Sequence, residues 1–581
     1  CPDHHYLESW NDANPKPGHY SLGQPTISPL GKTRQAQDSL LKWAGVSSGY
    51  EDFIKKYWKE NIFTKQTVSL VFTSFWNQSL HDGVVTVSAG PVGDSVVEAV
   101  VGKESDSSFG SVLMAAAQSV RGETAAGDWE LQMYEKTGIG DGTHANNPWL
   151  QELPDPVSKV CWDNYLTMNP DEMKDRGFNT VLGQVQEADL VEVTANGVTQ
   201  TLPVYPQYGQ TKGTLGLALG YGRTSAGKTG TGIGQNAYAL CSFGDHLQYQ
   251  ASDVTVSGSV GKYQIATTQT HHTMMGRAPV RATTLDEFMG DPKAGNPDVT
   301  IASSDHKQMK ADELNLWQDF DRPGHHWGMS IDLNACIGCG ACVVGCGSEN
   351  NVSVVGKDEV ARSREMQWIR IDRYYSSDTD KHGSLNLQEI PSSSENLEVS
   401  FQPIMCQHCN HAPCETVCPV AATTHSNDGL NQMAYNRCVG TKFCQNNCPY
   451  KVRRFNWFSY QNDSKFANVN PAQDDMGRMV LNPEVVVRSR GVMEKCSMCI
   501  QRIQSGKLVA KKEGRRIVDG EFQTACAAAC PTHAITFGDK NDPESRVSKN
   551  QADPRSYFLL EELGVQPTVN YMTKVRNKEI G

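Results

Sequence analysis

The chain has 581 residues, enough for about three or four domains of ordinary size. Its formal net charge of −12 argues against a general nucleic-acid-binding protein, because such a protein carries a basic surface. No stretch approaches the roughly 18 to 20 apolar residues of a membrane-spanning helix, so we expect the chain to meet a membrane only through partners.

The first residue is Cys1, and no basic-then-apolar signal segment opens the chain. We therefore expect a chain that is processed or incomplete at its start. A mature lipoprotein would also begin with Cys, so the first residue alone leaves both interpretations open.

Residues 1–145 mix helical and strand signals, and we expect an α/β region there. Apolar residues recur at helical spacing over 33–43 and 50–60. The residues on the apolar side are Leu40, Leu41, Trp43, Phe53, Ile54 and Tyr57. The runs at 68–72 and 84–87 are typical of short buried strands.

The pattern becomes β-rich over 146–270. DLVEV at 189–193, TLPVY at 201–205 and LGLAL at 215–219 are short runs separated by Gly, Asn and Pro turns. Residues 271–324 have few apolar positions and are typical of a linker. After it, MSIDLNAC predicts a strand that leads into a first group of cysteines.

The segment GRTSAGKT at 222–229 fits the pattern of a phosphate-binding loop. That motif requires a helix to start at the lysine, so that its N-terminus carries the phosphate. Gly230, Gly232 and Gly234 follow at once, and each costs a helix about 1 kcal/mol. We interpret the segment as a glycine-rich loop between strands and expect no nucleotide.

The cysteines are concentrated in one part of the chain. Three lie in the first 335 residues and fifteen between Cys336 and Cys530, whereas a disulfide framework would spread them through the loops it joins. The four groups are Cys336, Cys339, Cys342 and Cys346; Cys406, Cys409, Cys414 and Cys418; Cys438, Cys444 and Cys448; and Cys496, Cys499, Cys526 and Cys530.

The spacing within these groups indicates iron–sulfur clusters. A C-x2-C-x2-C loop wraps three iron corners of a cubane with soft thiolates, and the fourth cysteine points to a neighbouring cluster. A proline follows the last cysteine of three groups and ends each loop without a backbone donor. Structural zinc also uses C-x2-C pairs, but it needs only two pairs and not four such groups. His408 and His411 fall inside the second group and are expected beside the cluster or at the surface.

The third group lacks one ligand. Thr441 stands where the register expects its second cysteine, and a threonine hydroxyl stays protonated at neutral pH. Fifteen cysteines fill three sets of four and one set of three, so we expect one 3Fe–4S centre. The alternative is that Thr441 or water completes a cubane.

The third group also carries a run of positive charge without any acidic residue. A cubane with four thiolates is anionic, so nearby cations offset its charge and raise its reduction potential. The alternative is a solvated basic turn. The cations are Arg437, Lys442, Lys451, Arg453 and Arg454.

Residues 325–581 resemble the four-cluster ferredoxin subunits of polysulfide, nitrite and dimethyl-sulfoxide reductase complexes, on CQHCNHAPCETVCP and CVGTKFCQNNCPYKVRRFNWF. The first part resembles molybdopterin oxidoreductase subunits, on HYLESWNDA, SLGQPTISPL and NPWLQELPDPVSKVCWDNYLTMNP, with DLVEVTANG in that family's β-barrel domain. Both halves on one chain, with Thr441, are similar to the iron–sulfur subunits of alternative complex III, a bacterial quinol-oxidising respiratory complex.

The resemblance implies a fold class of α/β plus β-barrel, the C-terminal part of a molybdopterin oxidoreductase-like fold, followed by an α+β four-cluster ferredoxin-like domain. The expected parts are 1–145 (α/β, N-terminally incomplete), 146–270 (β-barrel), 271–324 (linker) and 325–581 (ferredoxin-like). It also implies three 4Fe–4S clusters, one 3Fe–4S cluster and no molybdenum. Because the match begins in mid-domain, a lipoprotein start is not expected.

The ligand-swapped ferredoxin fold implies which cysteines share a cluster. The implied sets are Cys336, Cys339, Cys342 with Cys530; Cys496, Cys499, Cys526 with Cys346; Cys406, Cys409, Cys414 with Cys448; and Cys438, Cys444 with Cys418 at the 3Fe–4S centre. These sets rest on the resemblance and not on the spacing.

The implied function is electron transfer from menaquinol to cytochromes within a respiratory quinol oxidoreductase. The implied partners are quinol-binding integral membrane subunits and multihaem and monohaem cytochrome c subunits, with the chain peripheral on the periplasmic face of the bacterial inner membrane. No carboxylate pair or nucleophile–base motif stands out, so we expect no substrate-converting site and no catalytic residue. Two rivals are the electron-transfer part of a molybdenum-dependent polysulfide or dimethyl-sulfoxide-type reductase, and a scaffold with redox-silent clusters.

Overall fold

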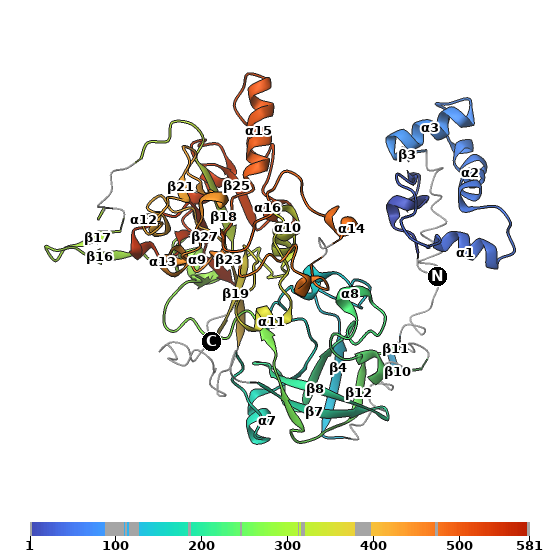
Figure 1. Ribbon diagram of the computed structural model, residues 1–581, viewed down its shortest axis with the longest axis horizontal. Helices are drawn as coiled ribbons and strands as arrows, with labels where there is room; N and C mark the ends of the chain where they lie inside the picture. Colours follow the sequence, from blue (N-terminus) through green and yellow to red (C-terminus); the bar gives the residue numbers. More distant parts are fainter. Residues whose placement is uncertain are drawn as a thin grey trace. The chain divides into compact units, whose positions relative to one another are not determined.

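The computed structural model describes most of the chain in two compact units, residues Cys1–Gly122 and Glu123–Gly581 (Figure 1). Cys1 itself, and with it the expectation about the chain start, lies outside the described residues. None of the helices in the described ranges is long and apolar enough to cross a membrane. The described residues are 3–87, 110, 113–114, 127–183, 187–244, 247–311, 313–314, 320–377, 397–470 and 474–577.

The first unit packs helices against a small antiparallel sheet. Its elements are β1 (Asn11–Lys16), β2 (His19–Gly23), α1 (Ala36–Trp43), α2 (Tyr50–Asn61), α3 (Phe72–Asp82) and β3 (Val84–Thr86). Its core is aromatic: the fully buried Trp58 meets Tyr20 and Trp76 edge to face at centroid distances of 6.2 and 5.8 Å. Such pairs are stabilising beyond the area they bury.

Two sequence expectations for this unit differ from the structure. The helices over 33–43 and 50–60 are present and Ile54 is buried as expected, but Leu40, Trp43 and Tyr57 on the expected apolar side are exposed. In α2 the buried side consists of Ile54 and Trp58. The expected strand at 68–72 is wrong. The Gln66 side chain accepts hydrogen bonds from the backbone N–H groups of residues 68 and 69, so it takes the donors that a strand would pair.

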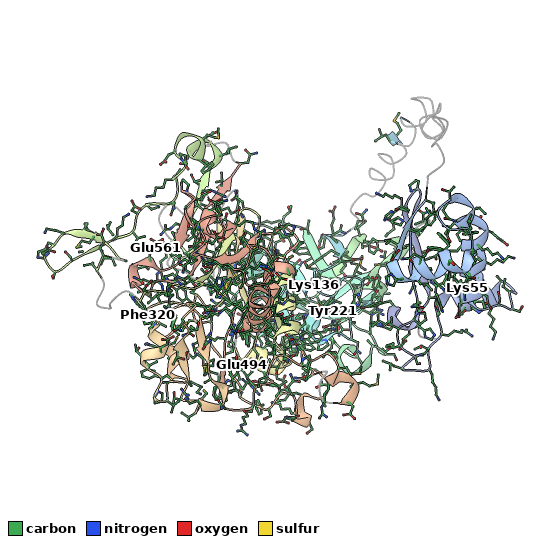
Figure 2. All side chains as sticks on the ribbon, turned by 90° about the horizontal axis from the view of Figure 1, so that it is seen from above. Lys55, Lys136, Tyr221, Phe320, Glu494 and Glu561 are labelled. Carbon is green, nitrogen blue, oxygen red and sulfur yellow. The ribbon has the colours of Figure 1, made fainter. Side chains whose placement is uncertain are left out.

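The second unit contains a closed β-barrel, as expected. Its strands are β4 (Trp129–Tyr134), β6 (Leu166–Met168), β7 (Ala188–Ala195), β8 (Val198–Pro206), β9 (Thr214–Ala218) and β12 (Gln250–Val256), with β13 (Gly261–Tyr263) added to β7. The barrel closes because β12 pairs with β4 on one side and with β7 on the other. Alternate residues of β7, such as Val191 and Val193, fill its interior. After β4 the buried Lys136 lies over the rings of Tyr165 and Tyr221, and Figure 2 labels Lys136 and Tyr221.

The phosphate-loop look-alike contains a helix of only four residues, α8 (Gly227–Gly230). Lys228 forms an ion pair with Asp474 at 2.7 Å, and the Thr229 hydroxyl donates to the backbone carbonyl of Asn468. The side chains that would hold phosphate are thus used to tie this loop to the part of the unit that carries the cysteine groups.

The cysteine groups lie around a four-stranded sheet and short helices. The sheet is β25 (Ile535–Asp539), β18 (Trp327–Asp332), β27 (Val569–Met572) and β26 (Ser556–Phe558), in that order. The helices are α10 (Ala341–Glu349), α11 (Lys357–Ala361), α12 (Pro413–Thr416), α13 (Phe443–Asn447), α14 (Asp475–Arg478), α15 (Ile500–Lys512), α16 (Ala525–Ala528) and α17 (Arg546–Gln551). β18 confirms the expected strand before Cys336, and α15 projects from the unit (Figure 1).

The remaining strands of this unit occur in short pairs. They are β5 (Val160–Cys161) with β14 (Ala266–Thr267), β10 (Ser242–Phe243) with β11 (Leu247–Gln248), β15 (Ala282–Thr284) with β28 (Lys574–Arg576), β16 (Thr300–Ala302) with β17 (Gln308–Lys310), β19 (Arg370–Ser376) with β20 (Glu398–Ile404), β21 (Thr423–His425) with β22 (Asn431–Met433), and β23 (Arg454–Phe455) with β24 (Met493–Glu494). The segment 271–324 therefore holds β15, α9 (Leu285–Gly290), β16 and β17, and its β15 pairs with the C-terminal β28. The four-part division by residue number stays a prediction.

The barrel and the cysteine-rich part share one hydrophobic core, which includes Trp162 and Ala266 from the barrel side. Glu152 lies fully buried at this junction and accepts hydrogen bonds from Gly356 N at 2.7 Å, Val355 N at 3.1 Å and Trp162 Nε1 at 3.2 Å. Burial raises the pKa of Glu152 to about 7, against the lowering effect of these donors. One carboxyl group thus satisfies three buried donors.

The raised pKa of Glu152 predicts a pH dependence. In the unfolded chain this group has its ordinary pKa of 4.5, so the folded state holds the proton more tightly. The contribution of Glu152 to the free energy of unfolding is therefore complete below about pH 4.5 and is lost as the pH rises through about 7. Glutamine cannot ionise. The free energy of unfolding of Glu152→Gln should therefore rise relative to that of wild type between about pH 5 and pH 8, by up to about 3 kcal/mol. Apparent melting temperatures at the two pH values measure this. The exposed Glu192→Gln is the control, and an unchanged pH dependence in Glu152→Gln would contradict the assignment.

Candidate metal centre

The fifteen cysteines of the four groups are all free thiols, and none of them is exposed. Ten are buried, and five are half-buried, namely Cys336, Cys339, Cys418, Cys438 and Cys530. The half-buried thiols belong to the loops of the first and third groups and to the last cysteines of the second and fourth. The groups therefore approach the surface at Cys336 and at Cys438.

The first and fourth groups exchange a cysteine in space. Cys530 lies near Cys336 and Cys342, where burial and the neighbouring thiols raise the pKa of Cys342 to about 12. Cys346 faces away from its own group, and burial followed by the proximity of Cys496 and Cys499 raises its pKa. Cys526 is the third cysteine near Cys346.

The second group meets the last cysteine of the third. A small enclosed cavity is lined by Cys406, Cys409, Cys414 and Cys448 together, with Arg453 and Asn431 in its wall. Burial raises the pKa of Cys414 to about 12, and Cys406 and Cys448 add to it. Four cysteine side chains around one hollow are suited to an inserted cationic core, because metal binding replaces thiol protons.

The third group approaches the surface at its first cysteine. Cys438 is half-buried, Thr441 is exposed, and Val439 beside them is 64% exposed. Arg453 is a neighbour of both Cys444 and Cys418. Another protein could therefore approach this group at Cys438, as it could approach the first group at the half-buried Cys336 and Cys339.

The four sets of thiols follow one another through the interior. Cys496 of the fourth group lies near Cys406 of the second, and Cys526 lies near Cys342 of the first. Arg453 connects the second group to Cys444 of the third. The order in space is therefore third, second, fourth and first group, which differs from their order in the chain.

Many sulfur atoms accept hydrogen bonds. The Asn350 side-chain amide donates to both Cys346 Sγ at 3.6 Å and Cys499 Sγ at 3.7 Å. Backbone N–H donors reach Cys418, Cys496, Cys499 and Cys530 at 3.2–3.3 Å. Such donors favour the thiolate form that iron requires. Asn350 was not expected from the sequence, where an asparagine after a helix carries no distinctive signal.

Buried cations accompany the second group. Arg453 and Lys495 are each 1% exposed, and among the described residues neither has a carboxylate within ion-pair distance. Arg453 Nε and the neighbouring His408 Nε2 are also without a hydrogen-bond partner in the described ranges. An unpaired buried cation is costly, so the site is built for a resident anion, and a cubane with four thiolates is one. The donor set and its charge thus fit an iron–sulfur cluster.

The zinc alternative predicts a different geometry. Thiols that share one zinc ion all lie about 2.3 Å from it, and thiols around a cubane lie farther apart. The part of the chain that the structure describes contains no group of three or more His, Cys, Asp or Glu side chains arranged for a single metal ion.

Two family models described as 4Fe–4S dicluster domains match residues 335–422 and 397–465. The iron–sulfur cluster-binding subunit of menaquinone reductase from Nitratidesulfovibrio vulgaris is 36% identical over 43% of this chain and 89% of that protein. A selenate reductase subunit from Mesobacillus selenatarsenatis is 31% identical over 42% of this chain and 72% of that protein. Iron–sulfur subunit 1 of the Hdr-like menaquinol oxidoreductase from Archaeoglobus fulgidus is 29% identical over 43% and 84%.

These matches define the class first: an iron–sulfur protein with 4Fe–4S ferredoxin domains. Within it, the chain belongs to the family of iron–sulfur subunits of membrane-associated quinol oxidoreductases. Acetylene hydratase from Pelobacter acetylenicus overlaps with a TM-score of 0.26 and 13% identity, over 45% of this chain and 37% of that one. That likeness is too low to define the fold of the first part.

The framework around the fourth group depends on a buried ion pair. Arg488 and Glu494 are 0% and 1% exposed and pair at 2.8 Å, and the Trp368 indole donates to the same carboxylate. Figure 2 labels Glu494. Arg488 also donates to the backbone carbonyls of Asn350 and Asn351. The pair therefore holds the strand before Cys496 against the end of α10.

Arg488→Met leaves a buried carboxylate without its cation and should lower the free energy of unfolding by about 3–5 kcal/mol. Arg502→Met is the matched control, because Arg502 pairs with Glu349 but its side chain is 36% exposed, and the loss there should be at most about 1 kcal/mol. Thermal unfolding of both variants at equal iron content measures the difference. Equal losses would contradict the role given to the buried pair.

Proposed function

We propose that the chain is the electron-transfer iron–sulfur subunit of a membrane-bound respiratory quinol oxidoreductase of the alternative complex III type. It passes electrons from menaquinol, oxidised in membrane partner subunits, to cytochrome c partners through three 4Fe–4S clusters and one 3Fe–4S cluster. The observation that carries this proposal is the continuous series of thiol sets, in which Cys406 adjoins Cys496 and Cys342 adjoins Cys526.

The proposed ligands follow the exchange of cysteines between groups. Three cysteines of one group share a cluster with the last cysteine of its partner group, and Thr441 stands at the missing corner of the 3Fe–4S centre. The proposed 4Fe–4S sets are Cys336, Cys339, Cys342 and Cys530; Cys346, Cys496, Cys499 and Cys526; and Cys406, Cys409, Cys414 and Cys448. The proposed 3Fe–4S ligands are Cys418, Cys438 and Cys444.

The protein's part in the chemistry is to hold and insulate these centres. When bound, the clusters supply one-electron acceptors and donors. The buried thiols of the second and fourth groups keep the middle of the series away from water, and the half-buried Cys438 and Cys336 bring its two ends toward partners. In this proposal the membrane partner binds at the Cys438 end. Electrons enter there and leave from the other end toward cytochromes.

Relatives in quinone- and menaquinol-linked complexes support the membrane partner. The periplasmic location, the cytochrome partners and a molybdenum-free first part remain proposals that rest on the resemblance to alternative complex III. The rival is a molybdenum-dependent polysulfide or dimethyl-sulfoxide-type reductase. One molybdenum per chain in the purified complex would favour that rival.

Anaerobic addition of a menaquinol analogue to the purified complex should bleach the visible absorbance of the clusters. Cys444→Ala removes a proposed ligand at the entry end, so quinol should reduce its remaining clusters at least tenfold more slowly, while dithionite still reduces them. Cys241→Ala, a half-buried cysteine outside the four groups, is the control and should match wild type. If dithionite reduces the clusters of the wild-type complex but menaquinol leaves them oxidised, the proposal is wrong.

A further inference from the structure

The buried cations are distributed unevenly among the four cysteine sets. Beside the fourth group each buried or half-buried arginine has its own carboxylate: Arg488 pairs with Glu494 and Arg502 with Glu349. Beside the second group Arg453 and Lys495 have none among the described residues. The acid Glu415 in that region contacts His425 and Asn431 instead and is 24% exposed.

Arg453 lies between two cysteine sets. Burial works against its charge, but Cys414, Cys444, Cys406 and Cys448 outweigh it, and the pKa of the guanidinium is raised. Three of these thiols line the hollow of the second group, and Cys444 belongs to the third. One cation is therefore shared by two neighbouring centres.

Lys495 lies on another side of the same set. It is among the charges that lower the pKa of Cys414 against the larger effect of burial. Its Nζ donates to the backbone carbonyls of Asn431 and Cys496, so it is held between the second and fourth groups. Asn431 fixes both cations, because its side-chain Oδ1 also accepts from Arg453 at 3.4 Å.

A buried cation has a larger effect on a redox centre than an exposed one. Reduction adds one negative charge, which a nearby positive charge stabilises, and the stabilisation grows as the local dielectric constant falls. Of the five cations in the 437–454 run, Arg453 alone is buried, whereas Arg437 and Lys451 are exposed to water. The other two are half-buried, and each has a partner of its own: Arg454 pairs with Glu365 at 2.7 Å, and Lys442 lies over the Trp457 ring.

We propose that Arg453 and Lys495 make the centre held by Cys406, Cys409, Cys414 and Cys448 the 4Fe–4S centre of highest reduction potential in the chain. It then captures the electron that enters at the Cys438 end. One electron passes, the donor centre at Cys444 is oxidised by one and this centre is reduced by one, and no bond or proton changes place. The inference deepens the proposed function and rests on it.

The test is a redox titration of the purified complex, followed by electron paramagnetic resonance, on Arg453→Met and Lys495→Met. Each variant should shift the redox equilibrium of this centre at least tenfold toward the oxidised form, which for a one-electron couple is about 59 mV. The centre nearest Cys336 should keep its wild-type potential. Arg453→Lys keeps the charge and should recover most of the shift.

Lys451→Met is the matched control, because it removes one exposed positive charge three residues after Cys448 and should shift the potential much less. An equal shift in Lys451→Met would overturn the inference. So would wild-type potentials in Arg453→Met and Lys495→Met variants that contain their full iron complement. If Arg453→Met does not retain its iron, the reduction potential measured in Lys495→Met alone tests the inference. A wild-type chain with no iron would instead remove the proposed function itself.

Discussion

The burial of many sulfur atoms in one interior is the constraint on which the second unit depends. Ten of the fifteen cysteines in the four groups are buried, and burial, with a smaller effect of neighbouring thiols, raises the pKa of Cys342 and Cys526 to about 12. Thiols in this state bind metal only when a cation replaces their protons. The surrounding N–H donors fit an anionic group, as do the charges of Arg453 and Lys495, for which the described residues provide no carboxylate partner.

The same constraint explains how the barrel is joined to the cysteine-rich part. The loops around the thiols are irregular and offer buried backbone donors that no sheet or helix pairs, and Glu152 from the barrel side satisfies two of them at Val355 and Gly356. Trp162 adds apolar surface to the common core. The barrel therefore acts as a wall of the cysteine-rich part.

The sequence predicted those features that depend on local spacing. The cysteine groups, the strand before Cys336 and the barrel strands β7, β8 and β9 all follow from residue patterns of a few positions. Prediction from the sequence failed for features that depend on contacts between residues far apart in the chain. The helical spacing around Trp43 showed an apolar side but not which side meets the core, and the expected strand at 68–72 is prevented by one side chain, Gln66.

Within the site, the sequence identified the candidate ligands but not their electrostatic surroundings. Arg453 was visible only as one of five cations, and Lys495 stood beside Cys496 without any sign that it would be buried. Burial of a charge is decided by segments far apart in the chain, here by Asn431 on β22, which contacts both cations. The order of the four groups in space is likewise a long-range property.

The central claim is that three sets of four thiols and one set of three hold four clusters, with Thr441 at the missing corner. The most direct test is electron paramagnetic resonance of the air-oxidised complex, because an oxidised 3Fe–4S centre is paramagnetic and oxidised 4Fe–4S centres are silent. We expect a near-isotropic signal of about one spin per chain that disappears in Thr441→Cys and persists in Thr441→Ser. A silent spectrum from the oxidised wild type would mean four complete cubanes and would contradict the claim.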